Sequence, residues 1–161
     1  MCSVRPVDYD GDLADLEASL SEKDVLRLQS CRAAVVDDDA YILVAERDGR
    51  VIGVGVVHVA ARDDMGWGPD SETPSFMDET SAYLESIEVS AEMRNRGIGT
   101  ALLHEVENEA QRRGKAYIRL HTDGQKVDAH RFYERNGWLY EKTVHPSWKQ
   151  GRATRVYVKR L

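Results

Sequence analysis

Hydrophobic positions along this chain follow first a strand period, then a helical one, and then alternate between the two. Residues 2–7 predict a short strand that runs to Pro6. Leucines at helical spacing predict a helix over 13–20, and a second is expected over 21–36, with Ser21 as its N-cap. Residues 41–60 predict two strands joined by Asp48-Gly49, which is a strong hairpin signal.

The second part of the chain predicts four strands and two helices. A strand is expected at 82–90, then a helix over about 98–113 with Gly114 after its end. A strand at 115–122, a helix at 126–136 and strands at 138–145 and 153–160 follow. The order β-αα-βββ-α-β-α-ββ predicts one α/β (α+β) domain over residues 1–161, with a mixed, mainly antiparallel sheet flanked by helices.

Composition narrows the class of protein. The 161 residues have a formal net charge of −6, whereas a general nucleic-acid binder needs a basic excess. No apolar run reaches the roughly 18–20 residues that cross a bilayer, and the N-terminus lacks a hydrophobic signal core. The two cysteines, Cys2 and Cys31, offer no metal-binding spacing. We therefore expect a reduced, cytoplasmic protein that binds neither metal, membrane nor nucleic acid.

The charge is unevenly distributed along the chain. Residues 1–62 contain 12 acidic and 7 basic side chains, and residues 63–81 contain six acidic ones and no basic one. Residues 82–161 contain 10 acidic and 15 basic side chains. The C-terminal half is therefore suited to a polyanion and the rest to a cation, although chance variation along a soluble chain explains the same numbers.

A glycine-rich turn lies between the strand at 82–90 and the helix that follows it. Its residues are Arg94, Asn95, Arg96, Gly97, Ile98, Gly99 and Thr100. The two glycines remove side chains that would obstruct a phosphate, and the helix start offers free N–H groups. The two arginines add positive charge that suits phosphate oxygens. The turn lacks the Gly-Lys-Ser/Thr ending of a Walker A loop, so it predicts another kind of phosphate site.

A second motif, Ala129-His130-Arg131-Phe132-Tyr133, begins about 30 residues later and ends at Gly137-Trp138. We expect Phe132 to be in the core and Tyr133 to lie beside it with its hydroxyl free. A phenol with a pKa near 10 can protonate a leaving thiolate whose acid has a pKa near 8.5, although packing alone also explains such a tyrosine.

The two motifs together resemble those of the GNAT superfamily of N-acetyltransferases. RNRGIG resembles the family's acetyl-CoA pyrophosphate loop, and AHRFYERNGW resembles its second cofactor motif. The resemblance implies that the amides of Arg94 to Thr100 bind the pyrophosphate and that the backbone of Ile87, Glu88 and Val89 pairs with pantetheine. Lys126 stands where the family often has Asn, and its amine would reach a phosphate.

The resemblance also implies acetyl transfer to an amine, which needs a base. Glu85 is the preferred base and Glu88 the alternative. Because they are three residues apart, an unbroken strand directs them to opposite faces, which a β-bulge would change. Tyr133 would then protonate the CoA thiolate.

We expect an acetyl-CoA-dependent N-acetyltransferase acting on a small cationic amine, aminoglycoside-like or polyamine-like, by direct attack in a ternary complex. Two alternatives stay open: a protein lysine or N-terminal acetyltransferase, and a non-catalytic acyl-CoA-binding module. A homodimer also stays open. The acidic stretch 63–81, with Trp67 and Phe76, is interpreted as an acceptor lid or a surface loop. His58, His121 and His130 are interpreted as structural.

Overall fold

The computed structural model describes residues 1–61, 77–146 and 149–161. Its elements, in chain order, are β1 (Ser3–Pro6), α1 (Leu13–Ser19), α2 (Glu22–Ser30), α3 (Arg32–Val36), β2 (Ala40–Arg47), β3 (Arg50–His58), β4 (Ser81–Val89), a 3-10 turn (Ala91–Met93), α4 (Ile98–Arg112), β5 (Tyr117–Asp123), α5 (Val127–Arg135), β6 (Leu139–Val144) and β7 (Thr154–Arg160).

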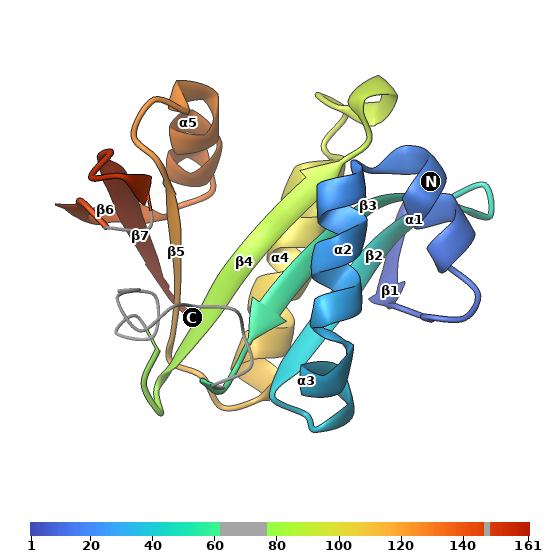
Figure 1. Cartoon of the computed structure of the whole chain (residues 1–161), viewed down its shortest axis with the longest axis horizontal. Coiled ribbons are helices and arrows are strands. Elements are labelled where there is room, and N and C mark those ends of the chain that lie inside the picture. Colours follow the sequence, from blue (N-terminus) through green and yellow to red (C-terminus); the bar gives the residue numbers. More distant parts are fainter. Residues whose placement is uncertain (62–76, 147–148) are drawn as a thin grey trace.

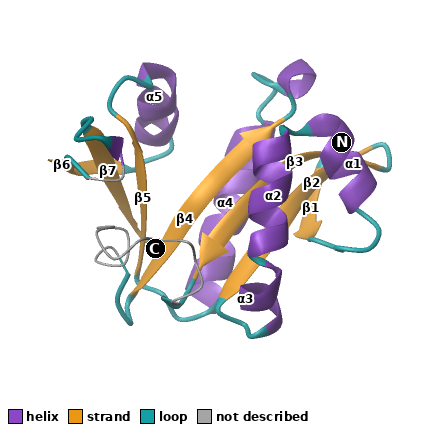
Figure 2. Cartoon of the chain, in the orientation of Figure 1, coloured by secondary structure: helices purple, strands orange, loops and turns teal. Residues whose placement is uncertain are grey.

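The strands form one seven-stranded sheet in the order β1-β2-β3-β4-β5-β7-β6. Only β4 and β5 pair in parallel; the other neighbours are antiparallel. Helices α1 to α3 cover one face of the sheet and α4 covers the other (Figure 1, Figure 2). The predicted fold class, a mixed, mainly antiparallel sheet flanked by helices, is confirmed.

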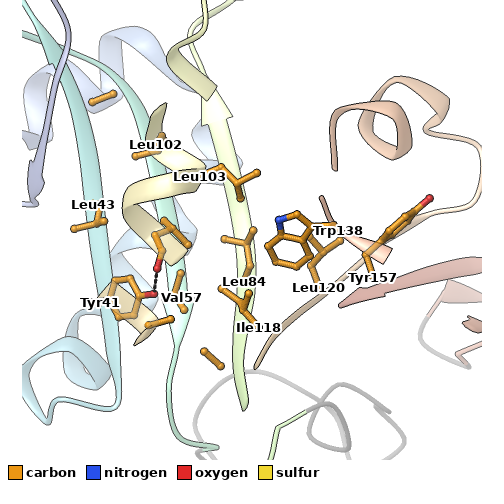
Figure 3. Packing of buried hydrophobic residues seen from close by; sticks show 14 of the residues in the cluster. Tyr41, Leu43, Val57, Leu84, Leu102, Leu103, Ile118, Leu120, Trp138 and Tyr157 are labelled. Carbon is orange, nitrogen blue, oxygen red and sulfur yellow. Dashed lines mark hydrogen bonds between the residues drawn. The ribbon is translucent and has the colours of Figure 1, made fainter. Parts of the chain in front are cut away.

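Two apolar clusters hold these layers together. On the α4 face, Leu102 and Leu103 are fully buried against strand residues such as Leu84 and Leu120 (Figure 3). On the opposite face, Leu16 and Leu28 of the N-terminal helices pack on alternate residues of β2 and β3. Helices α1, α2 and α4 bury the apolar residues that the spacing predicts, and this burial is the main stabilising contribution. In α5, Phe132 is expected in the core but is only partly buried against it.

The N-terminal helical region differs from the sequence prediction. The single helix expected over 21–36 is divided at Cys31 into α2 and α3, so this region has one more helix than predicted. The Cys31 amide donates to both Arg27 O (3.1 Å) and Leu28 O (3.2 Å). This shared bond is typical of a helix end, and no glycine or proline marks it in the sequence.

The β2–β3 hairpin has the predicted turn. Asp48 and Gly49 both have positive φ, 53° and 74°, as a type I′ turn requires. The turn places Arg47 opposite Arg50, and an irregularity between Ala45 and Glu46 then shifts the register by one residue, so that His58 lies opposite Ala40.

The long loop predicted after β3 lies mostly outside the described residues, and so do Trp67 and Phe76. The loop is expected to extend to residue 81, but Ser81 is already the first residue of β4. Among the described residues, no helix is long and apolar enough to span a membrane.

Candidate acetyl-transfer site

Strands β4 and β5 begin side by side and then diverge. Their parallel ladder contains only three pairs, from Ser81↔Tyr117 to Tyr83↔Arg119. Beyond it, Trp138 lies between the side chains of β4 and β5 (Figure 3). The main chain of β4 after Tyr83 therefore presents an edge that β5 does not pair with.

A cleft of about 550 Å³ follows this edge. Its walls come from β4, from the turn before α4 and from α5. The lining residues are Ile87, Glu88, Val89, Arg94, Asn95, Gly97, Gly99, Thr100, Ala129, Phe132, Tyr133 and Arg135. The structure thus brings the two sequence motifs together on opposite walls of one cleft.

The turn before α4 has the backbone of an anion-binding loop. Asn95 and Gly97 both have positive φ, 59° and 78°, and Gly97 caps the 15-residue helix α4. A Cβ on Gly99 would lie 3.5 Å from the Phe132 ring, so its absence keeps the cleft open. The helix start adds a partial positive charge and free amides, which suit a pyrophosphate.

Three of the predicted cofactor residues do not line this cleft. The side chain of Ile98 is buried in the core, where it anchors the start of α4. Arg96 lines a separate hollow beside the β2–β3 hairpin. Lys126 is exposed and caps α5, although its charge acts on the Glu88 carboxyl.

A β-bulge interrupts β4 at Glu85. Val57 pairs with Leu84 and Val56 pairs with Ser86, which leaves Glu85 without a partner in the β3–β4 ladder. The bulge resets the alternation of side chains along the strand. Glu88 is consequently opposite Val54, on the face that α1 to α3 cover, and Arg27 of α2 acts on both glutamates. The two candidate bases therefore share one face.

Three side chains from two other elements surround the Glu85 carboxylate. His58 Nε2 at the end of β3 hydrogen-bonds to Oε2, and Arg27 Nε lies 3.2 Å from Oε1. The Cys31 thiol donates to Oε2 at 3.5 Å and lies 4.0 Å from His58 Nε2. Burial acts to raise the pKa of Glu85, but His58 and Arg27 reverse this and hold it below the usual value.

The same cluster contains donor types that zinc accepts. One atom each of Cys31, His58 and Glu85 lies within 4.8 Å of the others. Arg27 already neutralises the carboxylate, and burial together with the Glu85 charge raises the pKa of the Cys31 thiol to about 12. Since a metal needs the thiolate, we interpret the group as a hydrogen-bonded cluster.

The remaining candidate residues, Glu88 and Tyr133, face the cleft. Burial, with the nearby Asp24 charge, raises the pKa of Glu88. Tyr133 packs edge-on against Phe132, at 5.2 Å between ring centres, and near Trp138 at 5.6 Å. Burial and the Glu88 charge raise the pKa of Tyr133, so the phenol keeps its proton at neutral pH.

A second polar pair lies next to the Glu85 cluster. Tyr83 hydrogen-bonds to His121 of β5, and the two rings stack at 5.5 Å. Tyr83 also stacks on His58 at 6.5 Å. Burial, with the Lys149 charge, lowers the pKa of His121 to about 4. This imidazole is therefore neutral at pH 7.

Sequence reasoning missed three members of the site, Arg27, Cys31 and His58. Arg27 lies on α2, Cys31 follows four residues later as the C-cap of this helix, and His58 ends β3. No local motif marks them, because only the pairing of β3 with β4 and the packing of α2 on the sheet bring them to Glu85. His130, by contrast, is buried and bonded to Asp123 O at 2.9 Å, which fits its predicted structural role.

Comparison with known proteins identifies the family. The model of the acetyltransferase (GNAT) family matches residues 9–138, and the chain belongs to this family. An aminoalkylphosphonate N-acetyltransferase from Salmonella typhimurium is 28% identical over 107 residues, which cover 66% of this chain and 61% of that protein. A mycothiol acetyltransferase from Nocardiopsis dassonvillei is 28% identical over 135 residues, 81% of this chain but 38% of its own length. The chain thus spans less than two thirds of both relatives.

Solved structures share the whole fold. PaiA N-acetyltransferase from Thermoplasma acidophilum, in complex with coenzyme A, matches with a TM-score of 0.72 and 19% identity over 100% of this chain and 99% of that one. A GNAT family acetyltransferase from Elizabethkingia anophelis with acetyl-CoA bound matches with a TM-score of 0.67 and 15% identity, covering 99% and 98%.

Proposed function

We propose that the chain is an acetyl-CoA-dependent N-acetyltransferase that acetylates the primary amine of a small acceptor. The observation that carries this proposal is the cleft along the unpaired edge of β4, with a glycine turn on one wall and Tyr133 on the other. Family membership and the solved relatives bound to acetyl-CoA or coenzyme A support acetyl-CoA as the donor.

In this reaction the donor lies along the unpaired edge of β4. Its pantetheine arm hydrogen-bonds to the backbone of residues 87–89 as an added strand would. The pyrophosphate accepts from the amides of the turn before α4, and Arg94 adds positive charge. Each contact comes from a residue that lines the cleft.

The chemistry is a direct transfer in a ternary complex. Glu85 takes a proton from the acceptor ammonium, and the neutral nitrogen attacks the thioester carbonyl carbon. As the carbon–sulfur bond breaks, the nitrogen releases its remaining extra proton to water, which leaves the neutral amide, and Tyr133 gives its proton to the departing thiolate. Both residues return to their starting states by proton exchange with water. The lowered pKa of Glu85 and the raised pKa of Tyr133 leave the carboxyl ionised and the phenol protonated at neutral pH, which are the starting states that the two proton transfers need.

The acceptor in this proposal is a cationic amine, aminoglycoside-like or polyamine-like. Glu85 and Glu88 share one face of the sheet, and Asp24 acts on Glu88 from α2. Carboxylates gathered on one side of the thioester position attract an ammonium group and orient it for deprotonation.

The test is a screen of small amines and peptides for CoA release, with mass spectrometry of the product. We expect Glu85→Gln and Tyr133→Phe each to lower kcat by about 10²-fold or more, as loss of a general base or acid does. Tyr140→Phe is the control, because Tyr140 is 52% exposed outside the cleft. Unchanged kcat in both variants across pH would refute the two roles, and CoA binding without release for any amine would favour a binding module.

A further inference from the structure

We propose that His58 is a positioning residue for acetyl transfer: its hydrogen bond holds the Glu85 carboxylate at the β4 bulge, ionised and directed at the acceptor amine. This inference rests on the proposed function, because it assigns a partner to the proposed base.

The β-bulge leaves the direction of the Glu85 side chain poorly fixed by the backbone. Glu85 has no partner in the ladder with β3, so its backbone is held less tightly than that of its neighbours. Its side chain is 21% exposed, which leaves it accessible to an acceptor. A carboxylate at an irregular strand position needs side-chain contacts to fix its direction.

His58 is built to supply that contact. Its side chain is 3% exposed, and its ring is held against Tyr83, the directly opposite residue on β4. Because packing holds the imidazole in place, its hydrogen bond from Nε2 holds the Glu85 Oε2 atom in a defined position. Arg27 engages the other oxygen, so the two carboxylate oxygens are held from different elements. In metal sites, removal of a partner that orients a ligand costs about 10–100-fold in activity, and we expect a loss of the same order here.

The charged and titratable groups that face Glu85 come from every neighbouring element. They are Arg27 of α2, Cys31 at the C-terminal cap of α2, His58 of β3 and His121 of β5. Burial favours the neutral acid, and the contacts with His58, Arg27 and Cys31 favour the charged carboxylate. Removing the His58 bond therefore moves the pKa of Glu85 upward, toward the value that burial favours.

The experiment compares two substitutions at this position. His58→Leu removes the hydrogen bond, whereas His58→Gln keeps an N–H donor at nearly the same reach but cannot titrate. We expect kcat to fall about 10–100-fold in His58→Leu and to return to within about threefold in His58→Gln, with KM for acetyl-CoA unchanged in both. The acidic limb of the kcat profile should move to higher pH in His58→Leu only. His104→Gln, at an exposed position of α4, is the matched control.

A double-mutant cycle separates this inference from the proposed function. In a Glu85→Gln background, His58→Leu should have no further effect on kcat, because the group that it positions is already gone. Full activity of His58→Leu, failure of His58→Gln to restore it, or additive losses in the cycle would overturn the positioning role. If Glu85→Gln itself leaves kcat unchanged, the proposed base is wrong instead. Should His58→Leu fail to fold, His58→Gln and Cys31→Ala still test the cluster through the pH profile.

Discussion

The imidazole of His121 is held in a neutral state by its surroundings. It lies against the Tyr83 ring and hydrogen-bonds to the phenol, and burial lowers its pKa from 6.5 to about 4. In the unfolded chain the same group takes up a proton as the pH falls through 6.5. Between pH 6.5 and 4 the unfolded state therefore binds more protons, and the free energy of unfolding falls as the pH falls.

This linkage predicts that His121 makes the folding stability sensitive to acid. We expect the free energy of unfolding to fall between pH 7.5 and pH 5, by up to about 2 kcal/mol from His121 alone. His121→Gln should remove most of this loss, and His104→Gln should not. Urea denaturation at the two pH values measures the difference. An equal loss in wild type and His121→Gln would contradict it.

Single residues were predictable where a local motif marks them. Gly97, Gly99 and Tyr133 stand in motifs that the sequence displays, and the cleft brings all three together. The partners of Glu85 come from other elements, and His58 is 27 residues away from Glu85 in the sequence. Their meeting depends on strand register and helix packing, which no local pattern specifies.

At the scale of elements, hydrophobic periods predicted every strand and most helices, because each element buries one face. Two irregularities that shape the candidate site could not be predicted from these periods. The end of α2 at Cys31 depends on how the helix packs, and the bulge in β4 depends on its pairing with β3. The bulge determines which face of the sheet Glu88 occupies. The arrangement of the candidate site therefore depends on a feature that the hydrophobic pattern does not predict.

The two glycines of the turn before α4 are expected to have different effects, Gly97 on stability and Gly99 on donor binding. Gly97 has a φ of 78°, and a Cβ there would contact nothing within 4 Å. Gly97→Ala should therefore cost about 1–2 kcal/mol of stability from backbone strain. Gly99 has no positive φ, and its Cβ would make only ordinary contacts with Phe132 and Val89, on the cleft side. Gly99→Ala should leave stability nearly unchanged and raise KM for acetyl-CoA.

Thermal unfolding without ligand and the KM for acetyl-CoA measure these two effects independently. Gly114→Ala is the control for strain, because Gly114 has a φ of 80° at the far end of α4 and does not line the cleft. It should lower stability like Gly97→Ala and leave KM unchanged. Unchanged KM in Gly99→Ala would argue that the donor does not approach this turn.

At the scale of the whole molecule, the candidate cleft lies where the sheet is least continuous. Strands β4 and β5 share three ladder pairs, and the cleft wall passes from β4 and α4 to α5 on the other side. A ligand that contacts both walls joins two parts of the sheet that have few backbone bonds between them. The basic excess of residues 82–161, with Arg94 and Arg135 on the cleft walls, suits a polyanion in this place.

Acetyl-CoA should therefore stabilise the folded chain strongly. At a concentration 100 times its Kd, a ligand that binds only the folded state adds about 2.7 kcal/mol, which raises Tm by about 5–10 °C in a chain of this size. Hydrogen exchange should slow both in the turn before α4 and in α5, because the ligand contacts both walls. Gly99→Ala should need more ligand for the same shift, since it narrows the cleft without straining the backbone. Protection confined to one wall, or a Tm that acetyl-CoA does not change, would show that this cleft does not bind the donor.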